Sequence, residues 1–288
     1  MAGPTAENHP GRRNGDVTPA PRRHEPTIAA ATGAAGGFLS GILGGGGGAI
    51  MVPLMTGPLR MGQHIAHGTS LVVIIVTAAV AAATYSVSGP VSGELVAALL
   101  VGAVTGAAIG ARGALRIPAM RLRQLFGLFL VAVSLRLLLM STVDPMLETD
   151  GATELGAGTL IGFAGGLASG ALGVGGGAIF VPALVLILGI EQHEAQGVSL
   201  WVIVGASISG AMTHYRQGTV DTAMARWVAP LALPGAIAGA MVAGMLSGRA
   251  LQVVFSVILT AIGIQMLVTA HRRLQAARRL SAEVVAAA

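Results

Sequence analysis

Two glycine runs are the residues most able to do chemistry in this sequence. They read LGGGGGAIMVP from Leu43 and LGVGGGAIFVP from Leu172. Glycine accepts positive φ angles and lets a ligand approach backbone amides closely, as in loops that cradle phosphates. If a new helix begins after each run, at Ala49 and Ala178, its first amides lack internal partners and carry the positive end of the helix dipole. The runs therefore predict anion binding through backbone N–H groups.

Hydroxyl side chains downstream of each run extend this candidate site. Ser70 and Ser199 occupy the same place after the two runs, and Thr69 precedes the first of them. Their hydroxyls could complete the hydrogen bonds of an oxyanion, although ordinary residues at a helix N-terminus would be of the same types. The predicted substrate-binding set is Gly44, Gly45, Gly46, Gly47, Gly48, Ala49, Thr69, Ser70, Gly173, Gly175, Gly176, Gly177, Ala178 and Ser199.

A few titratable residues are further candidates. His64 and His193 also follow both runs, and could carry a coupling proton or simply lie at an interface. Arg136 stands inside the apolar stretch VAVSLRLLLM, where it could attract an anion or extend toward the outer surface. Tyr85 and His214 end apolar segments, so we expect both rings at the membrane interface. No cluster has metal-ligand spacing, so we expect neither a metal nor a cofactor.

The composition indicates that membrane-spanning helices position these residues. Of the 288 residues 53% are hydrophobic and 10% charged, and apolar stretches long enough to cross a bilayer recur along the chain. This predicts an all-α, polytopic integral membrane protein. The absence of cysteine excludes disulfides and thiol catalysis. The net charge of +5 does not indicate nucleic-acid binding, because the arginines cluster at the ends of apolar segments.

The chain contains an internal duplication. With an offset of 129 residues, residues 36–140 align without a gap to residues 165–269, with 37 identities in 105 positions. The sequence therefore divides into a disordered, Arg/Pro-rich cytoplasmic tail (1–27), transmembrane repeat 1 (28–141), an acidic linker (142–154), transmembrane repeat 2 (155–270) and a basic C-terminal tail (271–288).

The arginines predict how the two repeats are oriented. The glycines strongly disfavour a continuous helix through each run. If each interrupted segment crosses the membrane once, ten arginines lie inside and six outside; if each returns to its own side, fifteen lie inside and only Arg249 outside. The positive-inside rule favours the second arrangement, with both termini cytoplasmic. The same count results if the first piece of each segment spans the membrane fully and only the second piece returns, so both geometries stay open. The two halves are then an inverted repeat with glycine-interrupted helices, and the broken backbone must line protein or a wet cavity.

Two other interpretations of the glycines stay open. Small residues let membrane helices pack closely, and this explains Gly102, Gly106, Gly110, Gly235 and Gly239, which are spaced by four. Residues 173–178 also fit the G-x-G-x-x-A pattern of dinucleotide folds. The lipid-length apolar context, without a soluble βαβ pattern, argues against that fold.

These residues resemble the sulfite exporter TauE/SafE family, also called the 4-toluene sulfonate uptake permeases. The matching elements are GGGGGAIMVP and GVGGGAIFVP, HIAHGTSL and HEAQGVSL, the RQGTVD turn at 216–221, and RLRQLFGLFLVAVSLRLLL. The resemblance covers about residues 30–270. It implies transport of small, often sulfur-containing anions such as sulfite, sulfoacetate or related organosulfonates. Val198 stands where the first copy has Thr69, so the two halves could contribute unequally.

The sequence thus predicts a permease or secondary transporter of small anions in the cytoplasmic membrane, working by alternating access. Its expected partners are the anion, the lipid bilayer, a coupling proton and a second copy in a homodimer, and not a nucleic acid. An anion channel on the same site is the first alternative. An intramembrane enzyme is the second, against which no nucleophile and base pair recurs within the segments.

Overall fold

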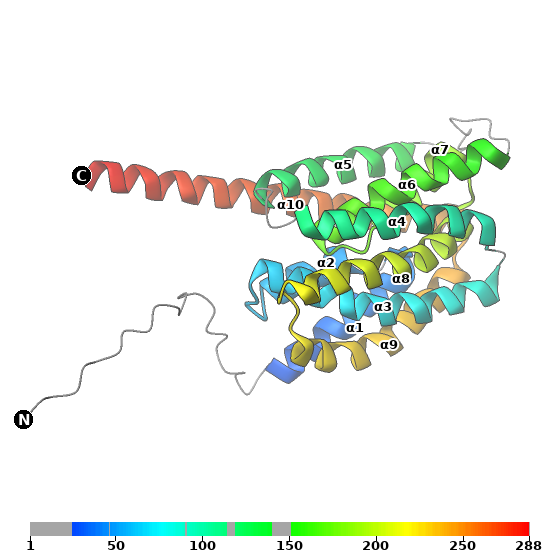
Figure 1. The fold of residues 1–288 in the computed structure, drawn as a ribbon, viewed down its shortest axis with the longest axis horizontal. Helices are drawn as coiled ribbons and strands as arrows, with labels where there is room; N and C mark the ends of the chain where they lie inside the picture. The colour runs from blue at the N-terminus through cyan, green and yellow to red at the C-terminus, as the bar shows by residue number, and fades with distance from the viewer. Residues whose placement is uncertain (1–24, 46, 90, 114–118, 140–150, 288) are drawn as a thin grey trace, which may run out of the picture.

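The computed structural model describes residues 25–45, 47–89, 91–113, 119–139 and 151–287. Within them the chain forms ten helices and no strand (Figure 1). The first half contains α1 (Glu25–Leu43), α2 (Gly48–Thr56), α3 (Gln63–Ser88), α4 (Gly93–Gly113) and α5 (Ala119–Leu139). The second contains α6 (Gly151–Leu172), α7 (Gly177–Leu188), α8 (Gln192–Arg216), α9 (Thr222–Met245) and α10 (Gly248–Ala287).

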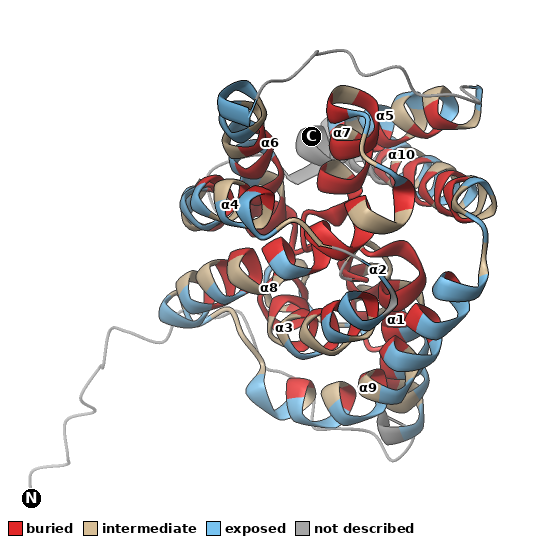
Figure 2. Ribbon diagram, turned by 90° about the vertical axis from the view of Figure 1, so that its right-hand side faces the viewer, coloured by how far each residue is buried: buried red, intermediate tan, exposed pale blue. Residues whose placement is uncertain are grey.

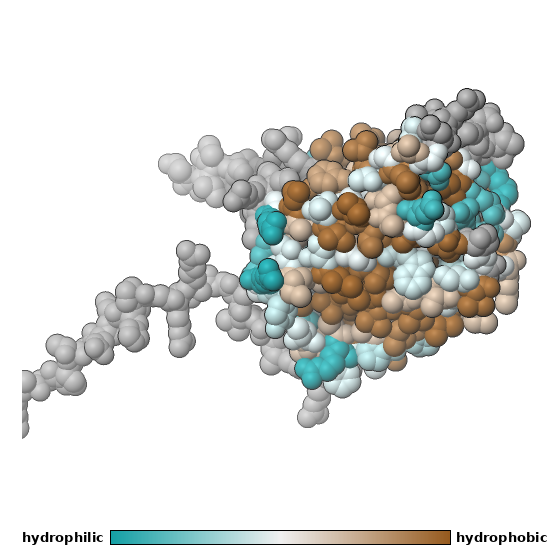
Figure 3. Space-filling view, turned by 45° about the vertical axis from the view of Figure 1, so that its right-hand side comes forward, coloured by the Kyte–Doolittle hydropathy of each residue, from teal (hydrophilic) through white to brown (hydrophobic). Residues whose placement is uncertain are grey.

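Six of the described helices are long and apolar enough to cross a membrane: α3, α4, α6, α8, α9 and the first part of α10, Gly248–Arg272. The outer surface is apolar as well, with large side chains such as Leu125, Leu160 and Trp227 more than 60% exposed. Figure 3 shows apolar side chains across the middle of one face and hydrophilic side chains toward its ends. Such a surface suits a hydrocarbon solvent. The expected all-α membrane protein is confirmed.

Helices pair across the two halves rather than within them. α1 packs on α9 and α4 on α6, while α3 and α8 pack on each other in the centre (Figure 2). Under the 129-residue offset, the pair α1 and α9 becomes the pair α6 and α4. α1 begins at the end of the bundle where α10 leaves, whereas α6 begins at the opposite end (Figure 1). The arrangement is compatible with the predicted inverted repeat.

Glycine faces make the close pairings between the halves. A Cβ added to Gly102 or Gly106 of α4 would lie 2.0 or 2.3 Å from a carbonyl oxygen of α6. A Cβ on Gly235 or Gly239 of α9 would lie 2.4 or 2.1 Å from a carbonyl oxygen of α1. Only glycine permits such backbone contact. The packing interpretation of these glycines is confirmed.

Charge separates along the bundle. Arg60, Arg112, Arg216 and Arg226 lie in loops or helix ends at the end where α1 begins, which we call the arginine end. At the opposite end α10 begins, with Arg249 in its first turn. Three predicted segment limits differ from the helices: α1 begins at Glu25 within the expected tail, α6 begins at Gly151 within the expected linker, and α10 continues through the expected C-terminal tail.

Candidate functional site

Both glycine runs interrupt the helical structure. Gly47 and Gly176 cap the following helices with φ angles of 67° and 84°, and Gly44, Gly173 and Gly175 also have positive φ. Residues with a side chain rarely adopt this left-handed backbone conformation, so these positions require glycine. α2 and α7 begin at Gly48 and Gly177, one residue earlier than the predicted Ala49 and Ala178. Gly46 lies outside the described residues.

The chain reverses direction at each break. A Cβ on Gly36 of α1 would lie 2.7 Å from Cε of Met51 in α2, and a Cβ on Gly47 would lie 2.4 Å from the carbonyl oxygen of Gly36. In the second half, a Cβ on Gly165 would lie 2.1 Å from the ring of Phe180. α2 therefore packs back along α1, and α7 along α6. Each interrupted segment returns toward the end from which it entered, as the arginine count predicts.

The two breaks touch each other. A Cβ on Gly48 would lie 2.5 Å from the carbonyl oxygen of Gly173, and a Cβ on Gly177 would lie 2.2 Å from Cα of Gly45. The same positions approach Ile74 and Ile203, which lie near the middle of α3 and α8. The starts of α2 and α7 thus meet at mid-depth in the bundle.

The first amides of α2 and α7 have the geometry of a helix start. The amides of Ile50 and Met51 donate to the carbonyl of Gly47 at 3.1 and 2.9 Å, and those of Ile179 and Phe180 to the carbonyl of Gly176 at 2.8 and 3.0 Å. The amides before these have no carbonyl of the preceding turn within their own helix. The positive ends of two helix dipoles therefore face one region from the two halves.

One face of α8 adds polar groups to this region. A Cβ on Gly44 would meet the side chain of Gln196 at 2.5 Å, and Ile203 lies next to Gly177. Gln196, Ser199 and Ile203 share one face because they are three, four and seven residues apart. Ser199 and Gln196 are both fully buried. Neither the Ser199 hydroxyl nor Nε2 of Gln196 has a hydrogen-bond partner.

The equivalent face of α3 is used differently. Ser70 is the repeat mate of Ser199. Its hydroxyl is a donor to two backbone carbonyl oxygens, that of His67 at 2.8 Å and that of Gly173 at 2.9 Å. The Ser70 hydroxyl thus ties α3 to the second break. Thr69 faces elsewhere, since its Oγ1 accepts a hydrogen bond of 2.9 Å from the amide of Asp221 before α9.

Two serines that the sequence analysis did not single out adjoin the breaks. Ser40 and Ser169 are both fully buried, and neither hydroxyl has a hydrogen-bond partner. A Cβ on Gly47 would lie 2.9 Å from Cβ of Ser40, and the carbonyl of Ser169 accepts from the amide of Gly173 at 2.8 Å. The sequence contains a signal for them, because the serine is identical in the two copies and stands four residues before the first glycine of each run.

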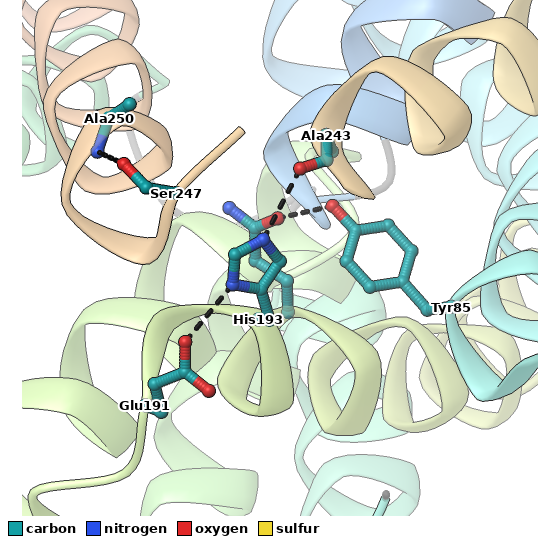
Figure 4. Close-up of polar contacts among 7 residues, drawn as sticks. Tyr85, Glu191, His193, Ala243, Ser247 and Ala250 are labelled. Carbon is teal, nitrogen blue, oxygen red and sulfur yellow. Dashed lines mark hydrogen bonds and ion pairs between the residues drawn. The ribbon is translucent and has the colours of Figure 1, made fainter. Parts of the chain in front are cut away.

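Arg136, His64 and His193 lie away from the breaks. Arg136 belongs to the last described turn of α5 and is half-buried. His64 is exposed near the arginine end. His193 lies at the opposite end, with Nδ1 3.1 Å from Glu191 Oε1 and Nε2 3.3 Å from the carbonyl of Ala243 (Figure 4).

A cavity of about 310 Å³, which we call the vestibule, opens at this opposite end. The ends of α3 and α9 and the start of α8 enclose it, with the lining residues Tyr85, Gly89, Val91, Glu191, His193, Glu194, Ala240, Gly244 and Leu246. The Tyr85 hydroxyl donates to Oε1 of Gln196 and lies 3.2 Å from the carbonyl of Gly41. The side chain of Gln196 also lies against Gly44, so the Tyr85–Gln196 pair lies between the vestibule and the first break.

Tyr85 and His214 occupy equivalent positions in the two repeats, and both are buried, with 5% and 0% exposure. Both residues lie near the ends of their helices, as expected, and their rings are enclosed by the bundle rather than exposed on its outer surface. Nε2 of His214 contacts the carbonyl of Gly170 at 3.0 Å, where Gly170 is the repeat mate of Gly41. The lengths of the apolar segments predict that these rings lie near helix ends, but their inward direction follows from the packing of α3 and α8. No group of three or more metal-ligating side chains occurs among the described residues.

Known proteins match most of this chain. The model of the family described as "Sulfite exporter TauE/SafE" matches residues 5–137 and 158–288. "Probable membrane transporter protein YunE" of Bacillus subtilis (strain 168) is 26% identical over 254 residues, which cover 80% of this chain and 93% of that protein. A "Probable membrane transporter protein" of Xylella fastidiosa (strain Temecula1 / ATCC 700964) is 27% identical over 237 residues, 80% of this chain and 90% of that protein.

A shorter match is to "Sulfite exporter TauE/SafE family protein 3" of Arabidopsis thaliana, 38% identical over 85 residues, 27% of this chain and 18% of that protein. No solved structure matches. The family model spans both repeats, including both glycine breaks and the α3 and α8 faces beside them. The chain therefore belongs to the sulfite exporter TauE/SafE family of membrane transporters.

Proposed function

We propose that this protein is a secondary transporter that moves small anions across the cytoplasmic membrane and binds them where the two glycine breaks meet. One observation carries the proposal: two helix N-termini meet at mid-depth beside buried Ser40, whose hydroxyl has no partner. A buried polar group without a partner costs about 1–3 kcal/mol, which a bound ligand recovers. Interrupted helices that point their N-termini at an anionic substrate are a recurring transporter device.

The donors favour an oxyanion of modest charge. The described buried polar side chains are of four neutral or weakly basic types, serine, threonine, glutamine and histidine. Hydroxyl and amide donors, together with helix dipoles, can surround the oxygens of a sulfite or sulfonate group without a buried full positive charge. Such a site holds an anion loosely enough to release it, as transport requires. Sulfite, sulfoacetate and related organosulfonates fit these donors, and the matched family's name supports this class.

The vestibule supports alternating access. Its lining includes Tyr85, which contacts Gln196, and His214 occupies the position equivalent to Tyr85 toward the arginine end. If the two repeats exchange conformations, the closed side would open as the vestibule closes. With the arginine end in the cytoplasm, the vestibule faces outward and both termini lie inside.

Uptake into proteoliposomes tests this proposal. Purified protein is reconstituted and supplied with radiolabelled sulfite, thiosulfate, sulfoacetate, isethionate or acetate at equal concentration. We expect saturable uptake of at least one sulfur oxyanion, and counterflow when the same unlabelled anion is loaded inside. Non-saturating flux without counterflow would instead indicate a channel, and chemical change of the added anion would indicate an enzyme.

Paired serine variants locate the site. Ser40→Ala and Ser169→Ala remove hydroxyls that have no partner, so the folded protein should lose little stability. Each should raise the half-saturating anion concentration by about fivefold to tenfold, since a hydrogen bond to a charged group contributes about 1.5–3 kcal/mol and water replaces part of it. If the half-saturating anion concentration of both variants equals that of the wild type, the anion does not bind at this site.

A further inference from the structure

We infer that His214 is the binding site of a coupling proton. The inference rests on the proposed anion transport and adds a second ligand to it. His214 is the most enclosed titratable side chain of α8, with 0% exposure, whereas the two histidines singled out from the sequence lie toward the surface. Histidine is the side chain whose ordinary pKa lies near physiological pH.

Both ring nitrogens of His214 have partners that suit proton uptake. Nε2 lies 3.0 Å from the carbonyl of Gly170, which can only accept, so Nε2 carries a hydrogen. Nδ1 lies 2.9 Å from Oγ1 of Thr219, and this oxygen also lies 3.0 Å from the backbone carbonyl of His214. In the neutral ring the Thr219 hydroxyl donates to Nδ1. In the charged ring Nδ1 donates to Thr219, whose hydroxyl turns to the carbonyl. A proton is thus accepted without moving a heavy atom.

Neighbouring histidines lead from the surface toward this ring. His64 is exposed on the first turn of α3, and its ring centroid lies 6.4 Å from that of His67, which is 4% exposed. Gly68 follows directly, and a Cβ there would lie 3.0 Å from Cβ of His214. α3 therefore carries two further imidazoles, those of His64 and His67, in the turn that precedes its contact with His214, at the arginine end.

The other elements around His214 contribute a backbone carbonyl, a hydroxyl, one carboxylate and two arginines. α6 contributes the carbonyl of Gly170, and the turn before α9 contributes Thr219 and then Asp221, whose carboxylate accepts from the amide of Met224 at 2.9 Å. The nearest helix ends carry Arg216 and Arg112, which are exposed. No group of three or more metal-ligating side chains occurs here among the described residues.

The position of His214 couples the proton to the anion. Gly170 belongs to the last turn of α6, directly before the second glycine break. A positive charge on His214 therefore raises the electrostatic potential at the site where the anion binds. At an effective dielectric constant of about 20 and a separation of roughly 10 Å, this increases anion affinity on the order of tenfold. The first repeat has Tyr85 at this position, and a phenol stays neutral, so coupling is one-sided.

The test separates anion movement from proton movement. Proteoliposomes contain a pH-sensitive dye, and the probe is thiosulfate, or isethionate if thiosulfate is not carried, because both stay fully ionised over the pH range used. Anion exchange at equal concentrations measures anion translocation alone. Net uptake with dye response measures proton coupling. His214→Gln keeps a donor for the carbonyl of Gly170 but cannot accept a proton, and His271→Gln, at an exposed position of α10, is the matched control.

We expect His214→Gln to retain exchange within about threefold of wild type, while proton movement and the pH dependence of net uptake are lost. His271→Gln should keep both. Proton movement that persists in His214→Gln, or wild-type uptake without proton movement, overturns the inference. If His214→Gln abolishes exchange too, Thr219→Val decides: loss of the Nδ1 partner must shift the pH midpoint of net uptake, and an unshifted midpoint overturns the inference. A wild-type protein that exchanges none of the tested anions contradicts the proposed function itself.

Discussion

Replacing Gly48 with alanine tests the contact between the two breaks. A Cβ at this position would lie 2.5 Å from the carbonyl oxygen of Gly173 and 2.7 Å from the carbonyl carbon of Val174. Non-bonded heavy atoms prefer about 3.5–4.0 Å, so the breaks must separate by roughly 1 Å. Both opposing atoms belong to the backbone, which cannot rotate away as a side chain would.

The expected effect on stability is small because two terms oppose each other. Overpacking costs about 1–3 kcal/mol, whereas alanine is favoured over glycine in a helix by about 1 kcal/mol. The net destabilisation of about 0–2 kcal/mol lowers the melting temperature by less than about 8 °C. Transport should fall far more, because a displacement of about 1 Å between interacting groups can cost on the order of 100-fold. Initial uptake of thiosulfate or sulfite and a thermal melt in detergent measure the two effects.

Gly156→Ala is the matched control for Gly48→Ala. Gly156 lies inside α6, and a Cβ there would meet nothing within 4 Å, so the variant gains helix propensity without a clash. We expect it to transport at the wild-type rate with an equal or higher melting temperature. If Gly48→Ala also transports at the wild-type rate, the helix starts do not form the binding site by their mutual contact, and the reasoning is refuted.

Three further results are expected. Ser70→Ala should destabilise the folded protein by about 1–3 kcal/mol, because it leaves the carbonyl of Gly173 without this donor, whereas Ser199→Ala should cost little stability; equal melting temperatures would contradict the difference. Tyr85→Phe should increase uncoupled anion leak about fivefold, because a hydrogen bond closing the vestibule floor contributes about 1 kcal/mol, and an unchanged leak would show that this contact is not a gate. The cysteine-free chain also allows topology mapping: a membrane-impermeant thiol reagent added to whole cells should label Gly93→Cys and not Gly62→Cys, and the reverse pattern would invert the proposed orientation.

The site was predictable in its position and not in its composition. The glycine runs, their equivalence in the two halves and the packing role of Gly102 and Gly106 follow from the sequence, because positive φ and close backbone approach are requirements that glycine alone meets. The serine at position 40 escaped notice because a serine in an apolar helix is ordinary until its burial and its missing partner are known.

The sequence by itself determined that the chain is helical, lies in a membrane, is duplicated, and breaks its helices at two equivalent glycine runs. These properties depend on hydropathy and on local backbone energies, which neighbouring residues set. Only the tertiary structure decided that the starts of α2 and α7 touch, and that Tyr85 and His214 face inward. Those outcomes depend on contacts between residues far apart in the sequence, for example 44 positions for His214 and Gly170 and 111 for Tyr85 and Gln196, and they require α3 and α8 to pack against each other.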